Sequence, residues 1–94
     1  MKIREFQDLM KKTYLAKDSR RGLEQTFLWL LEEIGELAKE VRRKDKSGCR
    51  QEMADCLAWL ASLANLLDIS LEEEAARYAA GCPKCQGIPC GCEN

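Results

Sequence analysis

Apolar side chains recur along most of the chain at the three- and four-residue spacing of amphipathic helices, and no stretch alternates as a strand would. The pattern predicts four helices, over about residues 2–16, 22–43, 48–67 and 70–80. The second is the most regular. Its apolar stripe centres on Leu23, Leu30, Ile34 and Val41, and we expect that stripe to be buried. The predicted fold class is therefore all-α, a small helical bundle.

Polar segments and capping residues mark the limits of these helices. The segment KDSRRG is expected to end the first helix, and Ser47 to cap the start of the third. Ser70 and Glu73 form a capping box for the short fourth helix. Beyond Gly81 the chain consists mainly of Cys, Gly and Pro. We therefore divide it into a helical domain, residues 1–81, and a cysteine-rich tail, residues 82–94.

Two pairs of acidic residues flank the apolar stripes, and the members of each pair are three positions apart. Glu33 and Glu36 fall on the second helix, and Glu52 and Asp55 on the third. A short connection makes these helices antiparallel neighbours, so residue numbers across their seam add to a nearly constant sum. That sum is 88 for Glu36 with Glu52, for Glu33 with Asp55 and for Trp29 with Trp59. The register thus brings four carboxylates together, with two tryptophans about one turn beyond them.

Four carboxylates gathered in a helical bundle repel one another, and a hard divalent cation relieves that repulsion. Mg²⁺ is usually bound by carboxylates together with water and phosphate oxygens, so the constellation suits a phosphate-bearing substrate. The alternative is a solvated acidic face, on which Glu36 pairs with Lys39 one turn away. Spacing alone leaves both interpretations open.

The composition argues against several classes of protein. The 94 residues carry 15 Lys and Arg against 16 Asp and Glu, so no basic excess favours nucleic-acid binding. There is no histidine, which excludes imidazole bases and His-bound metals. No apolar run reaches membrane length and the start does not resemble a signal peptide, so we expect a cytoplasmic protein. A chain this short buries only about 60–65% of its unfolded surface, which favours oligomers.

The acidic motifs also carry a family resemblance. EEIGE at residues 32–36, followed by EMAD at 52–55, resembles the EExxE…ExxD signature of MazG-type nucleotide pyrophosphohydrolases, which are related to the dimeric all-α dUTPases. The resemblance covers about residues 20–77. It implies Mg²⁺-dependent cleavage of a nucleoside triphosphate between its α and β phosphates, giving a monophosphate and pyrophosphate. It also implies a homodimer or homotetramer.

Carried over residue by residue, the resemblance assigns roles to the acids. It makes Mg²⁺ ligands of Glu33, Glu36, Glu52 and Asp55. Glu32 matches the first Glu of EExxE and is expected to orient the attacking water or hold a second metal.

Residues that contact the substrate are less clearly marked. Many relatives carry Asn and Lys near the end of the last helix, but ARYAAG stands there in this chain, with Arg77 and Tyr78 as partial substitutes. Lys39, Lys46 and Arg50 flank the acids and are alternative phosphate contacts or plain surface charges. Trp29 and Trp59 either pack in the core or an interface, or wall the site and stack on a base.

The tail has the pattern C-x2-C-x4-C-x-C, formed by Cys82, Cys85, Cys90 and Cys92. Four thiolates are the ligand set of a closed structural Zn²⁺ site, so a zinc knuckle is the leading interpretation. An iron–sulfur cluster, redox dithiols and a disordered reduced tail are the alternatives. Cys49 and Cys56 fit helix-start and core positions, and without a neighbouring His neither is expected to be a nucleophile.

Three functions remain in view. The first is a Mg²⁺-dependent nucleoside triphosphate pyrophosphohydrolase that cleans or limits the nucleotide pool. The second is a non-catalytic helical interaction module with a zinc-stabilised tail. The third is a nucleotide-binding regulator with slow turnover.

Overall fold

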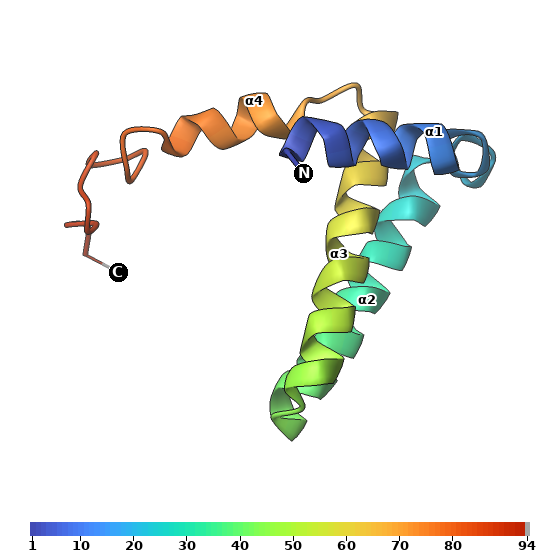
Figure 1. The fold of residues 1–94 in the computed structure, drawn as a ribbon, viewed down its shortest axis with the longest axis horizontal. Helices are drawn as coiled ribbons and strands as arrows, with labels where there is room; N and C mark the ends of the chain where they lie inside the picture. The colour runs from blue at the N-terminus through green and yellow to red at the C-terminus, as the bar shows by residue number, and fades with distance from the viewer. Residues whose placement is uncertain (94) are drawn as a thin grey trace.

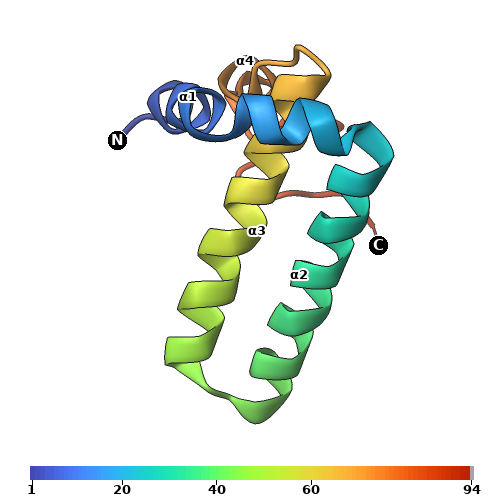
Figure 2. The same ribbon diagram turned by 90° about the vertical axis from the view of Figure 1, so that its right-hand side faces the viewer.

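The computed structural model describes residues 1–93, which form helices and no strand. Helix α1 spans Ile3–Arg21, α2 Leu23–Arg43, α3 Lys46–Leu66 and α4 Leu71–Ala75, and the 3-10 turn η1 follows at Ala76–Tyr78. α2 and α3 form an antiparallel hairpin, α1 lies across one end of it, and α4 leads away toward the tail (Figures 1 and 2). The all-α prediction is confirmed.

Helix α1 is longer than its pattern predicts. The KDSRRG segment, expected to end the helix, instead continues it through Arg21. The segment contains no proline, and its Lys and Arg residues favour helix. The helix ends at Gly22, whose φ of 91° suits glycine far better than other residues. The added turn carries Lys17, Asp18 and Arg21, which were expected to lie in a loop.

The N-cap of α3 lies two residues earlier than expected. Asp45, not Ser47, is the N-cap of α3, and its carboxylate accepts a hydrogen bond from the backbone N–H of Gly48 at 3.1 Å. Gly48 lies against the end of the Glu40 side chain of α2, which a Cβ there would push aside. The Ser70 cap of α4 is confirmed, because its hydroxyl accepts from the N–H of Glu73 at 3.2 Å.

A buried glutamine fastens α1 to the far end of α3. The Gln7 side-chain amide donates to Asn65 Oδ1 at 2.9 Å and to the Ile69 carbonyl at 2.7 Å. Its Oε1 accepts from the N–H of Leu71 at 2.9 Å. These bonds hold α1 against the corner where α3 ends and α4 begins, so α1 is fixed relative to the hairpin.

Only part of the predicted apolar stripe of α2 is buried. Leu30 is buried as expected, together with Thr26, whereas Ile34 is 47% and Val41 54% exposed. The half-buried Glu33 continues the line of Thr26 and Leu30 along the helix. The sequence alone does not say whether α3 or another chain covers an apolar stripe. Within residues 1–93 most of the stripe faces outward, and Glu33 takes a half-buried position beside Leu30.

No single helix among residues 1–93 has the length and apolar composition needed to cross a membrane. Lys46–Leu66 and Leu71–Tyr78 meet that test only as a pair, with a bend of 109° between them.

Candidate metal centre and adjoining pocket

Three carboxylates from two helices converge in the α2–α3 seam. Glu33 of α2 and Glu52 and Asp55 of α3 each offer an oxygen, and these oxygens lie within 4.8 Å of one another. The antiparallel register brings Glu33 close to Asp55, as the sequence predicts, and also to Glu52, which was expected to lie level with Glu36. Carboxylate oxygens at this spacing are the ligands that a hard divalent cation prefers.

The electrostatics of this cluster are unfavourable without a cation. Partial burial, and then the neighbouring carboxylates of Glu52, Asp55 and Glu36, raise the pKa of Glu33 above its usual value. Glu52 Oε2 is buried and has no hydrogen-bond partner among the described residues. An acceptor buried without a donor is costly, and a bound cation removes that cost. The residues present therefore fit a divalent metal.

The other two predicted acids lie at the edge of the cluster. Glu36 is exposed and is outside the group of oxygens within 4.8 Å, although its charge contributes to the raised pKa of Glu33. Glu32 is also exposed and outside that group. Their expected roles, ligand for Glu36 and water orientation for Glu32, stay predictions.

The two tryptophans meet one turn away from the acids. The rings of Trp29 and Trp59 are stacked, with centroids 5.9 Å apart and planes 12° from parallel. This contact confirms the predicted register of the hairpin. The Arg21 guanidinium carbon lies 4.8 Å from the Trp59 ring centroid, and Arg21 is paired at 2.6 Å with the buried Asp18. The end of α1 thus packs directly on the aromatic pair.

A cavity of about 240 Å³ opens beside Asp55. Its walls come from the end of α1 and from α3: Tyr14, Lys17, Asp18, Arg21, Asp55, Ala58, Trp59 and Ser62. It joins a cluster acid to an aromatic ring and two cationic side chains. The four α1 residues were missed from the sequence, because the helix was expected to end before most of them. The sequence did contain a signal for these residues, the cations Lys17 and Arg21 of KDSRRG. They could be placed beside the acids only once α1 was seen to continue through them.

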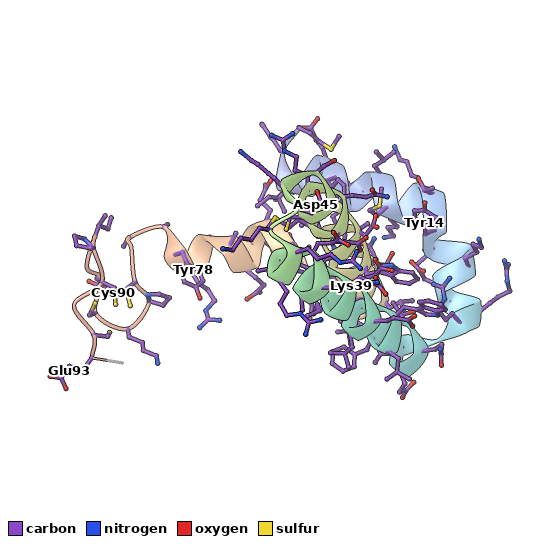
Figure 3. The ribbon with its side chains drawn as sticks, turned by 90° about the horizontal axis from the view of Figure 1, so that it is seen from below. Tyr14, Lys39, Asp45, Tyr78, Cys90 and Glu93 are labelled. Carbon is purple, nitrogen blue, oxygen red and sulfur yellow. The ribbon has the colours of Figure 1, made fainter. Side chains whose placement is uncertain are left out.

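The remaining predicted contacts lie elsewhere. Trp29, Lys39 and Arg50 are exposed, and none of them lines the cavity. Lys39 lies on the hairpin and is labelled in Figure 3. Burial, followed by the charges of Glu33, Glu52 and Asp55, raises the pKa of Cys56. Its thiol is therefore less acidic than usual, which argues against a nucleophilic role as the sequence predicts.

The four tail cysteines form a second cluster. Their sulfur atoms lie within 4.8 Å of one another, and they gather around the labelled Cys90 in Figure 3, away from the hairpin. Backbone N–H groups of Gly91 and Gly87 lower the pKa of Cys85 to about 6. The cluster can hold a metal ion.

Comparison with known proteins decides the family. The family model of the MazG nucleotide pyrophosphohydrolase domain matches residues 21–83. The chain belongs to the MazG family. A search of the curated proteins finds no match. The MazG match contains the acidic cluster, Glu32, Glu36 and both tryptophans. It leaves out most of α1 and three of the four tail cysteines, so these parts of the chain need a structural explanation of their own.

Proposed function

We propose that this MazG domain is a Mg²⁺-dependent nucleoside triphosphate pyrophosphohydrolase that cleaves between the α and β phosphates. The observation that carries the proposal is the convergence of Glu33, Glu52 and Asp55 within 4.8 Å, with Glu52 Oε2 lacking a donor. Such a cluster costs stability unless a cation occupies it, and a cation of this class binds phosphate oxygens in its remaining positions. The products are a nucleoside monophosphate and pyrophosphate.

The metal ligands we assign are Glu33, Glu52, Asp55 and Glu36. Glu36 is one turn along α2 from Glu33 and its charge raises the pKa of Glu33, which supports a place for it at the edge of the metal site. When bound there, Mg²⁺ supplies charge neutralisation on the phosphates, polarisation of phosphorus and a lowered pKa for the attacking water. Glu32 is exposed beside Glu33, and we assign it the orientation of that water.

The cavity beside Asp55 is the proposed place for the parts of the nucleotide that extend from the metal centre. Lys17 and Arg21 bring positive charge next to the acids, which suits phosphate oxygens. The exposed part of Trp59 gives an apolar surface for a base or sugar. Lys39, Arg50 and Trp29 remain proposed substrate contacts from outside this cavity.

We further propose that the chain works as a homodimer or a dimer of dimers. The outward face of α2 exposes 45% of Phe27, 47% of Leu31 and 47% of Ile34. A run of half-exposed apolar residues on a long helix marks an interaction surface. A second copy offers the same helix, and a symmetric contact would bury both stripes. The tail cysteines hold a structural ion in this proposal and take no part in hydrolysis. The proposed location is the cytoplasm.

The test is a substrate panel. Purified full-length chain is incubated with canonical and modified nucleoside triphosphates and Mg²⁺, and monophosphate and pyrophosphate are measured. We expect release of both products in equal amounts, and none after removal of divalent ions. Glu24→Gln, an exposed acid on the same helix, is the matched control for Glu36→Gln.

Two results would count against the proposal. If no nucleotide gives product although calorimetry detects nucleotide binding, the protein is a regulator rather than an enzyme. If Glu36→Gln keeps full activity, Glu36 is not a ligand and its assignment is wrong.

A further inference from the structure

The backbone of the tail is shaped to bring its four sulfur atoms together. The N–H of Gln86 donates to the Cys82 carbonyl at 2.6 Å, and the N–H of Cys82 donates to the Gly87 carbonyl at 3.2 Å. Gln86 itself takes a left-handed conformation with φ of 59°. These features close a tight turn between the first two cysteines, after which the chain returns to place Cys90 and Cys92 against them.

Backbone amides point at the sulfur atoms. The N–H groups of Gly87 and Gly91 donate to Cys85 Sγ at 3.4 and 3.3 Å, and the N–H of Cys92 donates to Cys90 Sγ at 3.3 Å. A Cβ at Gly87 would lie 2.7 Å from the Pro89 carbonyl oxygen and 3.3 Å from Cys85 Sγ, so the turn needs glycine there. A neutral thiol is a weak acceptor, whereas these donors suit thiolates.

The sulfur spacing fits a single tetrahedral ion. Cys82 Sγ lies 3.8 Å from Cys92 Sγ, and Cys85 Sγ lies 3.9 Å from Cys90 Sγ. A tetrahedral ion with Zn–S bonds of about 2.3 Å places its sulfurs about 3.8 Å apart. A disulfide would need about 2.05 Å. A multi-iron cluster spreads its four thiolates over several irons and therefore holds them farther apart than one ion does.

We propose that Cys82, Cys85, Cys90 and Cys92 bind a single Zn²⁺ in a closed, structural tetrathiolate site that fixes the fold of the tail. Binding displaces the protons of those thiols that are still protonated, with no change in the oxidation state of metal or sulfur. All four positions of the ion are then filled by protein, which leaves none for a substrate.

The site is separate from the acidic cluster. The tail extends beyond α4 and η1 to one side, away from the α2–α3 hairpin that carries the acids (Figure 1). Sulfur is a soft ligand that selects zinc, whereas the carboxylates select Mg²⁺. Loss of zinc should therefore loosen the tail and leave the helices intact.

The experiment measures metal in the full chain and in two cysteine variants. Reduced protein is titrated with Zn²⁺ against a chromophoric chelator, and bound metal is counted by elemental analysis. We expect one zinc per wild-type chain, near zero in Cys90→Ser, and one in Cys49→Ser, whose sulfur lies on α3 outside the cluster. Replacement of zinc by Co²⁺ should give the intense visible bands of tetrahedral thiolate coordination.

Further readouts keep the proposal open to refutation. Limited proteolysis of Cys90→Ser should cut the tail faster, while its helical circular dichroism stays that of the wild type. The proposal is overturned if the reduced wild-type chain fails to compete for Zn²⁺, if it retains iron in preference, or if Cys90→Ser binds zinc as tightly as the wild type.

Discussion

The acidic cluster and the cysteine cluster both gather metal-binding atoms within 4.8 Å, but they are built in different ways. The three carboxylates come from two long helices and meet only when α2 and α3 pack in register. The four sulfurs come from residues 82–92, so local turns are enough to assemble them. The acidic cluster therefore depends on the tertiary fold, whereas the cysteine cluster depends on the local conformation of the tail.

The two clusters also differ in what they leave open. Three carboxylates do not fill the coordination sphere of Mg²⁺, which then has room for water and phosphate oxygens. Four thiolates complete the tetrahedron of Zn²⁺. The difference teaches that a chain without histidine can offer two chemically distinct ligand sets, hard carboxylate oxygens in the helices and soft sulfurs in the tail.

The largest expected effect separates the two centres. Glu52→Gln should lower kcat/KM for the best nucleotide by more than about 100-fold, because changing even a residue that supports a ligand costs 10- to 100-fold. The variant should still hold one zinc per chain. Steady-state kinetics and elemental analysis on the same sample measure both. Glu24→Gln is the control, and a Glu52→Gln enzyme of normal activity would remove Glu52 from the centre.

The reverse variant completes the comparison. Cys90→Ser should lose its zinc and keep the kcat of the wild type, because the tail lies away from the acids. The measurement is initial rate at saturating nucleotide, before and after zinc removal. A large fall in kcat on zinc loss alone would show that the tail acts on the acidic centre.

A charged residue on the exposed apolar face of α2 should affect the acidic centre and leave the cysteine cluster unchanged. Ile34 is 47% exposed, and burying the exposed half of this side chain on both protomers of a symmetric dimer contributes about 1.5–3 kcal/mol in total. Ile34→Lys should therefore weaken dimerisation by at least 10-fold, measured by sedimentation, and lower activity with it. Zinc content should not change. Gln25→Lys, at an exposed position of the same helix, is the control for an added positive charge. An unchanged dimer in Ile34→Lys would place the contact elsewhere.

Much of the centre was predictable from the sequence. The register follows from two long helices joined by a short turn, and the Trp29–Trp59 stack bears it out. The cysteine spacing likewise indicates convergent sulfurs. The direction of the α2 stripe was not predictable, because an apolar stripe looks the same whether α3 or another chain covers it. The cavity was missed because the charged segment KDSRRG was expected to end the first helix. In the structure this segment is helical up to Arg21, and the helix ends at Gly22.

Smaller effects are expected at the cavity. Lys17→Ala should raise KM several-fold with little change in kcat, because an exposed cation next to the acids binds phosphate in the ground state and the transition state alike. Lys12→Ala, one turn earlier and outside the cavity, is its control. A fall in kcat with constant KM would instead give Lys17 a role in the reaction itself. Arg21→Ala is a poor test, because it leaves the buried Asp18 unpaired and destabilises the fold.

The smallest effect is a pH dependence of stability in metal-free protein. The pKa of Glu33 is raised in the fold, so between its unfolded value near 4.5 and its folded value the native state holds more protons. The contribution of Glu33 to stability is thus fully present below pH 4.5 and is lost as pH rises through the folded pKa.

Glu33→Gln removes this loss, and its amide can donate to Glu52 Oε2. We expect the variant to melt a few degrees above the metal-free wild type at pH 7, since about 1 kcal/mol shifts the melting temperature of a small domain by 4–8 °C. The gap should narrow toward pH 4.5 and reverse at pH 7 when Mg²⁺ is added, because the variant has lost a ligand. Thermal melts at both pH values, with and without Mg²⁺, measure this, and zinc-bound tails in all samples keep the second cluster constant. Equal melting temperatures at pH 7 without metal would mean that the carboxylates do not repel one another as the geometry requires.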